Sequence, residues 1–112
     1  MKIEVLFPEF CNLFGDMGNI QYLKMCLPES TFIETSIKGE PAFISENVDM
    51  IYMAPMTERG QIKVIEKLKP YKERIEELIE NNTVFLFVGN ALETLGKYIE
   101  IEDGTKIEAL GI

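Results

Sequence analysis

The stretch TVFLFVGNALETLG, residues 83–96, decides how we expect this chain to fold. Residues 83–88 are apolar or β-branched, as in a buried strand, and Gly89 then turns the chain into a short helix that stops at Gly96. A strand–turn–helix of this kind often carries a nucleophile at the turn, where the carboxyl end of the strand meets the amino end of the helix. Glycine offers no side chain there, so the chain is an enzyme whose nucleophile lies elsewhere, a former enzyme, or a fold that never had a nucleophile.

Strands and helices alternate along the rest of the sequence. We expect further strands over 2–7, 31–37 and 48–54, and a helix within 15–28 that Pro28 ends. Residues 61–82 show helical spacing interrupted by Pro70, which predicts two helices or one sharply kinked helix. Residues 97–112 predict a hairpin around Asp103-Gly104. The pattern indicates one α/β domain over 1–112, with three α/β/α layers and a mainly parallel, flavodoxin-like sheet.

The composition excludes several classes of partner. The chain has 112 residues and a net charge of −8, from 11 basic and 19 acidic residues. An acidic surface argues against nucleic acid and against anionic lipid, which both require clustered Lys and Arg. We see neither an apolar run long enough to cross a membrane nor a secretory signal, and therefore expect a cytoplasmic protein with no membrane partner.

The residues that usually support nucleophilic or metal chemistry are sparse. The two cysteines, Cys11 and Cys26, lack metal-ligand spacing, and the chain has no histidine. We therefore expect free thiols, no metal and no cofactor, and no Cys-His or Ser-His pair within the chain. Cys26 is expected to be buried on the first helix. Cys11 is expected to face a pocket mouth with a small thiolate fraction.

In a parallel sheet, ligands bind at the carboxyl ends of the strands. Three loops begin there, after Phe7, Met53 and Val88. The first loop is either a ligand loop at a helix start, or a turn in which Asp16 caps the helix and the glycines allow the bends. The candidate binding residues in the three loops are Asp16, Asn19, Ala54, Met56, Thr57, Gly89, Asn90 and Glu93.

Four segments resemble, in this order, the amino-terminal half of a known domain: VLFPEFCNLFGDMGNI, VDMIYMAPMTERGQ, FLFVGNALETLG and IEDGTKIEALGI. The domain is the class I glutamine amidotransferase of the cobyric acid synthase type, and within it the small amidotransferase subunit of lipid II amidation complexes. Residues 12–19 match the motif Asn-Leu-Tyr-Gly-Asp-x-Gly-Asn of that group at all but one of the specified positions, Phe14 replacing its Tyr. The resemblance implies a sheet that is incomplete at its C-terminal side.

Departures from the family's pattern bear on activity. Gly89 stands where the family has the cysteine that forms a glutamyl thioester, and glycine forms no such adduct. Pro55 and Met56 replace glycines in a run whose backbone N–H groups help to form the family's oxyanion hole, and proline has no N–H. The family also continues past IEALGI and takes its His and Glu partners from that later half. The resemblance thus implies a truncated chain, a split gene product or a fragment of a longer protein, in each case without the nucleophile.

Two hypotheses follow. In the first, the chain is a pseudoenzyme without catalytic residues, which docks to or regulates an ATP-dependent amide-forming synthetase in cobyrinate or cell-wall type chemistry. In the alternative, it is a small-ligand-binding α/β module whose pocket is lined by Met53, Met56, Thr57, Asn90 and Glu93. Because half of a sheet leaves an open edge, we also expect either a homo-oligomer or pairing with the missing half.

Overall fold

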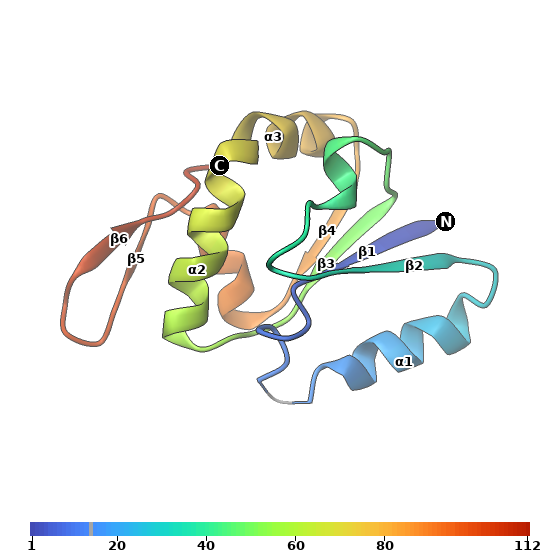
Figure 1. Cartoon of the computed structure of the whole chain (residues 1–112), viewed down its shortest axis with the longest axis horizontal. Helices are drawn as coiled ribbons and strands as arrows, with labels where there is room; N and C mark the ends of the chain where they lie inside the picture. The colour runs from blue at the N-terminus through green and yellow to red at the C-terminus, as the bar shows by residue number, and fades with distance from the viewer. Residues whose placement is uncertain (14) are drawn as a thin grey trace.

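The computed structural model describes residues 1–13 and 15–112 (Figure 1). Phe14, one position of the 12–19 motif, lies outside the described residues. The elements, with η for 3₁₀ helices, are β1 (Lys2–Leu6), α1 (Met17–Cys26), β2 (Thr31–Thr35), η1 (Ala42–Ile44), β3 (Met50–Met53), α2 (Glu58–Leu68), η2 (Lys69–Tyr71), α3 (Lys72–Glu80), β4 (Val84–Phe87), η3 (Gly89–Leu95), β5 (Tyr98–Glu100) and β6 (Lys106–Glu108).

The four long strands form one parallel sheet in the order β2-β1-β3-β4. Val5 lies between Glu34 and Tyr52 in register, and Tyr52 is in turn paired with Leu86. The expected mainly parallel, flavodoxin-like sheet is therefore confirmed. β5 and β6 form a separate antiparallel hairpin, and Gly104 in its turn has a φ of 87°. The antiparallel pairing of β5 with β6 confirms the expected hairpin as well. The positive φ in its turn is one that favours glycine.

Helices cover both faces of the sheet (Figure 1). α1 packs on the face that carries Tyr52 and Leu86, while η1, α2 and α3 lie on the opposite face. α2 begins at Glu58, three residues before the expected helix, because the Thr57 hydroxyl accepts a hydrogen bond from the Gly60 N–H at 3.1 Å. Pro70 falls in η2, so the two-helix alternative is correct.

A buried carboxylate fastens η1 to the sheet. Glu4 in β1 is fully buried, and its oxygens accept hydrogen bonds from the Thr35 hydroxyl at 2.6 Å and from the N–H groups of Ala42 and Phe43 at 2.7 and 2.8 Å. The two N–H groups belong to the start of η1, where a helix has no internal partners for them. No local sequence pattern marks this anchor, because the partners of Glu4 lie more than thirty residues away.

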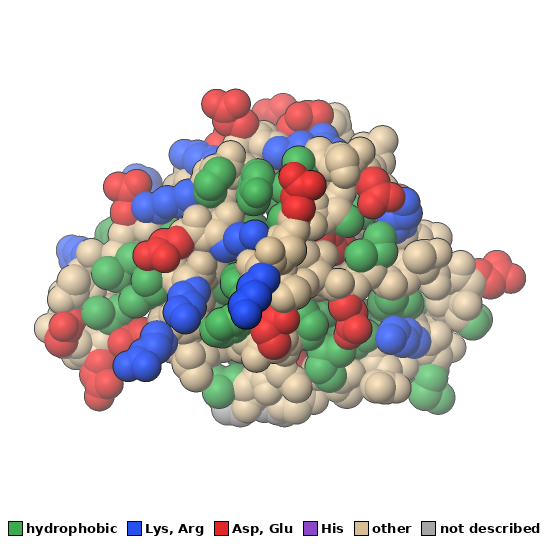
Figure 2. Space-filling model, viewed as in Figure 1, with side chains coloured by type: hydrophobic (Ala, Val, Ile, Leu, Met, Phe, Trp, Pro, Cys, Tyr) green, Lys and Arg blue, Asp and Glu red, His purple; other side chains and the backbone are tan. Residues whose placement is uncertain are grey.

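The outer surfaces of α2 and α3 are charged, as expected for amphipathic helices. Figure 2 shows Lys and Arg side chains gathered over α2 and acidic side chains over α3. On their inner faces Val64, Ile65, Leu68, Ile75 and Leu78 are buried. None of the described helices is long and apolar enough to cross a membrane.

The expectation that Cys26 is buried is wrong. Ile20 is the buried residue of α1, and Cys26 is exposed. At about 100° per residue, Cys26 lies about 120° away from Ile20 around the helix axis, whereas Leu23 and Leu27 lie within about 60° of Ile20. The half-buried Leu23 and Leu27 therefore share the inner face with Ile20, and the thiol points to solvent.

Candidate functional site

The turn after β4 has the shape expected from the sequence. Gly89 follows the strand with a φ of 59°, and η3 begins at this residue. The short helix that was expected is a 3₁₀ helix. A Cβ atom placed on Gly89 would lie 2.9 Å from Cγ of Pro55, closer than real Cβ atoms approach a neighbour. Any side chain at position 89 would meet both an unfavourable φ and a steric clash.

Asn90 joins the loop after β4 to the loop after β3. Its side-chain oxygen accepts a hydrogen bond from the Met56 N–H at 3.0 Å, and its side-chain nitrogen donates to the Met56 carbonyl at 2.7 Å. Gln61 in α2 adds a third bond, donating through Nε2 to the Asn90 carbonyl at 2.9 Å. The N–H of Met56 is therefore already occupied by a group of the protein itself.

The loop after β1 contacts the loop after β3 at Pro55 and Met56. The Leu13 N–H donates to the Pro55 carbonyl at 3.3 Å, and Sγ of Cys11 lies 3.9 Å from Sδ of Met56. The structure thus brings all three carboxyl-end loops together around Pro55 and Met56. Met56 and the preceding Ala54 are each 1% exposed, so both belong to the core.

The expectation that Cys11 faces a pocket mouth is wrong. Its side chain is 2% exposed. Burial, with smaller contributions from the carboxylates of Glu9 and Asp16, raises the pKa of the Cys11 thiol from 9.0 to about 12. The thiol is therefore protonated at neutral pH, and a protonated thiol is a weak nucleophile.

The remaining candidates in the first loop are tied to β3. Asp16 occupies the N-cap position of α1. The Met17 N–H, however, donates its hydrogen bond to Oδ1 of Asn12, at 3.0 Å. Asn19 donates through Nδ2 to the Tyr52 hydroxyl at 3.2 Å, and this hydroxyl lies 3.5 Å from the Asp16 carbonyl oxygen, to which it donates. Sequence reasoning missed Asn12 and Tyr52. Asn12 carried no local signal, because it lies ahead of the N-cap position, which Asp16 occupies.

The other two candidates face solvent. Thr57 and Glu93 are both exposed, and Thr57 serves as the N-cap of α2. Asn19 lines a cavity of about 210 Å³ between α1 and the sheet, together with Tyr22, Leu23, Tyr52, Leu86 and Val88.

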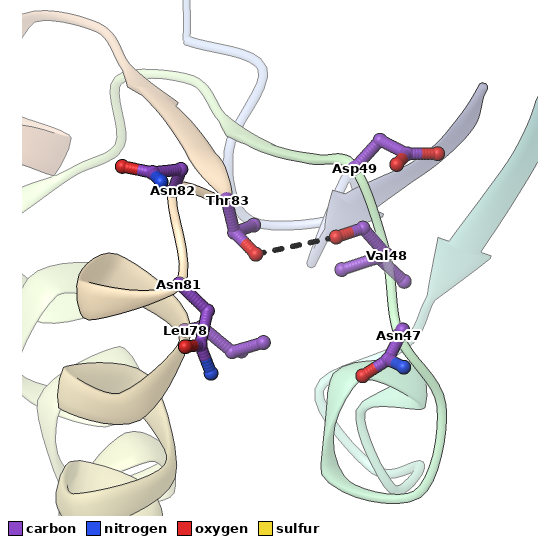
Figure 3. A pocket seen from close by; sticks show the side chains of 7 residues that line it. All are labelled: Asn47, Val48, Asp49, Leu78, Asn81, Asn82 and Thr83. Atoms are coloured by element: carbon purple, nitrogen blue, oxygen red, sulfur yellow. Dashed lines mark hydrogen bonds between the residues drawn. The ribbon is translucent and has the colours of Figure 1, made fainter.

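A larger cavity of about 340 Å³ lies at the other end of the strands, where β3 and β4 begin (Figure 3). Figure 3 shows Leu78 and Asn81, at the end of α3, facing Asn47 and Val48, with Thr83 hydrogen-bonded to the Val48 carbonyl at 3.3 Å. The wall of this cavity is mainly polar. The cavity lies at the amino ends of β3 and β4, whereas active sites of parallel sheets lie at the carboxyl ends of the strands.

A comparison with known proteins gives one informative relationship. The chain is 27% identical, over 114 aligned residues that cover all of it, to the GatD subunit of lipid II isoglutaminyl synthase (glutamine-hydrolyzing) from Streptococcus pneumoniae. It is a distant amidotransferase-like relative of that subunit. The chain spans 44% of the length of this curated relative. No family model matches the chain.

Proposed function

We propose that this chain is an amidotransferase-like pseudoenzyme of the cobyric acid synthase type, which works in the cytoplasm without glutaminase activity. Its role is to dock to or regulate an ATP-dependent amide-forming synthetase. The packing of Gly89 against Pro55 carries this proposal, because position 89 has no side chain and the neighbouring proline occupies the space that a side chain would need.

The surrounding residues support the loss of chemistry. Amide hydrolysis through a thioester requires a thiolate and N–H donors aimed at the developing oxyanion. Here the Cys11 thiol, which contacts Met56, is buried and protonated. Pro55 has no N–H, and the Met56 N–H is bonded to Asn90. Each change alone would lower the rate, and together they support a chain without glutaminase activity.

The well-packed loops support a retained structural role. Asn90 makes three hydrogen bonds with Met56 and Gln61, which hold the loops after β3 and β4 and the start of α2 together. The related pneumococcal protein is a subunit of a lipid II isoglutaminyl synthase, which supports a partner in cell-wall type chemistry more than one in cobyrinate chemistry.

Two measurements test the two parts of this proposal. Ammonia release from glutamine tests the first part, and we expect none from the purified chain. Calorimetric titration with the amide-forming component of a lipid II isoglutaminyl synthase tests the second, and we expect saturable binding. Absence of binding would contradict the docking role while leaving the catalytic inference in place.

The alternative of a ligand-binding module makes a different prediction. An amino acid or nucleotide that binds the folded chain would raise its melting temperature in proportion to the occupancy of the site. The burial of Ala54 and Met56 and the closure of the Met56 N–H by Asn90 favour the docking role, because these groups are not available to a ligand.

A further inference from the structure

The cavity at the amino ends of β3 and β4 has a frame that hydrogen bonds of the protein itself hold in place (Figure 3). Its volume of about 340 Å³ lies at the lower end of the range for small-molecule sites, which is about 300–1,000 Å³. The Thr83 hydroxyl donates to the Val48 carbonyl at 3.3 Å, and the Val84 N–H donates to the Asp49 carbonyl at 3.0 Å. These two bonds join the segments on either side of the cavity, so its shape does not depend on a ligand.

The end of α3 forms one side of this cavity. The Asn82 N–H donates to the Ile79 carbonyl at 3.1 Å, and the Thr83 N–H donates to the Leu78 carbonyl at 3.0 Å. These are the two bonds of a Schellman motif, in which the residue after the helix has a positive φ. Asn82 occupies that position with a φ of 67°. The motif accounts for Asn82, but it makes no use of the side chain of Asn81.

Two carboxamides lie on opposite sides of the cavity. Asn47 precedes β3 and Asn81 follows α3, and Figure 3 shows both side chains at the cavity. Both residues are exposed, and among the described residues neither side chain hydrogen-bonds to another group of the protein. A carboxamide offers a donor and an acceptor side by side. Two of them across a common space can therefore bind two edges of one small molecule.

The cavity has an apolar floor between these carboxamides. Val48 and Leu78 are 4% and 2% exposed and belong to the main core, and Figure 3 shows them facing each other. A flat molecule can cover this floor while its edges reach Asn47 and Asn81. Small-molecule sites commonly combine an apolar base with a few polar groups that fix the orientation of the ligand.

The charges around the cavity favour an uncharged ligand. Asp49 is the charged residue among those described that line it, and its Oδ2 accepts a hydrogen bond from the Lys2 N–H at 2.7 Å. Figure 3 shows this carboxylate directed away from the space between Asn47 and Asn81, so it is not placed to bind a cation there. An anion is disfavoured because the chain carries a net charge of −8.

We propose that this cavity binds a small, planar, uncharged molecule that carries a hydrogen-bond donor next to an acceptor, as carboxamides and nucleobases do. Asn47 and Asn81 hydrogen-bond the edges of the ligand, and Val48 and Leu78 support its flat face. The site lies at the opposite end of the strands from the loops that carry the proposed function, so this inference is independent of that function.

Heteronuclear NMR titration tests the site, because it reports the side-chain NH₂ groups of asparagine directly. Nicotinamide represents the carboxamides, adenine represents the nucleobases, and pyridine is a flat ring that lacks the amide. We expect nicotinamide or adenine to shift the NH₂ signals of Asn47 and Asn81 saturably, with a dissociation constant of about 1 mM or lower. Pyridine is expected to leave both signals unchanged. Absence of a saturable shift with both ligands, or an equal shift with pyridine, would overturn the proposal.

Three variants assign the contacts. Asn47→Ala and Asn81→Ala each remove one hydrogen-bonding edge, and we expect at least about threefold weaker binding in each. Asn82→Gly is the matched control, because glycine keeps the positive φ and Figure 3 shows the Asn82 side chain directed away from Asn47 and Asn81. We expect its affinity to be unchanged, and the backbone signals in the same spectra show whether each variant is folded. Unchanged binding in both alanine variants, or equal weakening in all three variants, would contradict the assigned contacts.

Discussion

A Cβ atom on Gly89 would approach Cγ of Pro55 to 2.9 Å, so these two residues are coupled by packing. Pro55 follows β3 and Gly89 follows β4, and the two strands are neighbours in the sheet. Pro55 and Gly89 therefore form one structural unit: with proline at 55, residue 89 has no room for a side chain.

The substitution Gly89→Ala measures this coupling. We expect a loss of stability of more than about 1 kcal/mol, because a positive φ is unfavourable for alanine and the methyl group meets Pro55. Gly104→Ala is the matched control, since Gly104 also has a positive φ but open space around its Cβ position. Urea unfolding of both variants gives the difference, and equal losses would show that Pro55 exerts no steric effect.

A second substitution isolates the proline. We expect Pro55→Ala to recover part of the stability that Gly89→Ala loses, with a coupling energy of about 0.5–3 kcal/mol in a double-mutant cycle. Additive losses would mean that residues 55 and 89 do not contact each other in solution.

Asn90 is expected to be a main support of the carboxyl-end loops. Asn90→Ala leaves the N–H and the C=O of buried Met56 without their partner, and an unsatisfied buried group costs about 1–3 kcal/mol. Amide hydrogen exchange at Met56 should accelerate in this variant. Unchanged exchange at Met56 would contradict the assignment of this hydrogen bond.

The two thiols are expected to react very differently. Cys26 is exposed and should be alkylated by iodoacetamide in the folded protein, whereas Cys11 should react only after unfolding. The pKa of Cys11 is raised from 9.0 to about 12, so its contribution to stability is fully present below pH 9. Between pH 9 and about 12 the unfolded thiol ionises while the folded one does not, and stability falls. Cys11→Ala should remove this part of the pH dependence in unfolding experiments.

Glu4 provides a test of the buried anchor. Glu4→Gln replaces one accepting oxygen by an NH₂ group that faces the N–H groups of η1, and we expect a loss of about 1–3 kcal/mol. Glu34→Gln on β2 alters an exposed carboxylate and should change stability by less than about 0.5 kcal/mol. Similar losses in both variants would argue against the anchor.

The sequence predicted those features that depend on neighbouring residues. Pro70 divides two helices, Gly89 turns the chain and Gly104 closes a hairpin, because proline and glycine restrict or widen the backbone angles of their own position. The alternating pattern of strands and helices likewise predicted the parallel sheet.

The features that the sequence did not reveal depend on distant partners. The sequence predicts Asn90 as a pocket residue, yet its amide bonds the backbone of Met56, 34 positions earlier. Glu4 joins three groups that lie in other elements, and no local pattern marks a buried carboxylate. The exposure of Cys26 depends on which face of α1 meets the sheet, and the weak amphipathicity of this helix did not fix that face.

Mass spectrometry of the intact chain after incubation with an electrophilic glutamine analogue tests the central claim most directly. We predict that the mass of the Cys26→Ser variant stays unchanged, together with zero ammonia release from glutamine, because position 89 offers no atom that attacks an amide. A stable acyl adduct on that variant, at Cys11 or at any other residue, would contradict the account.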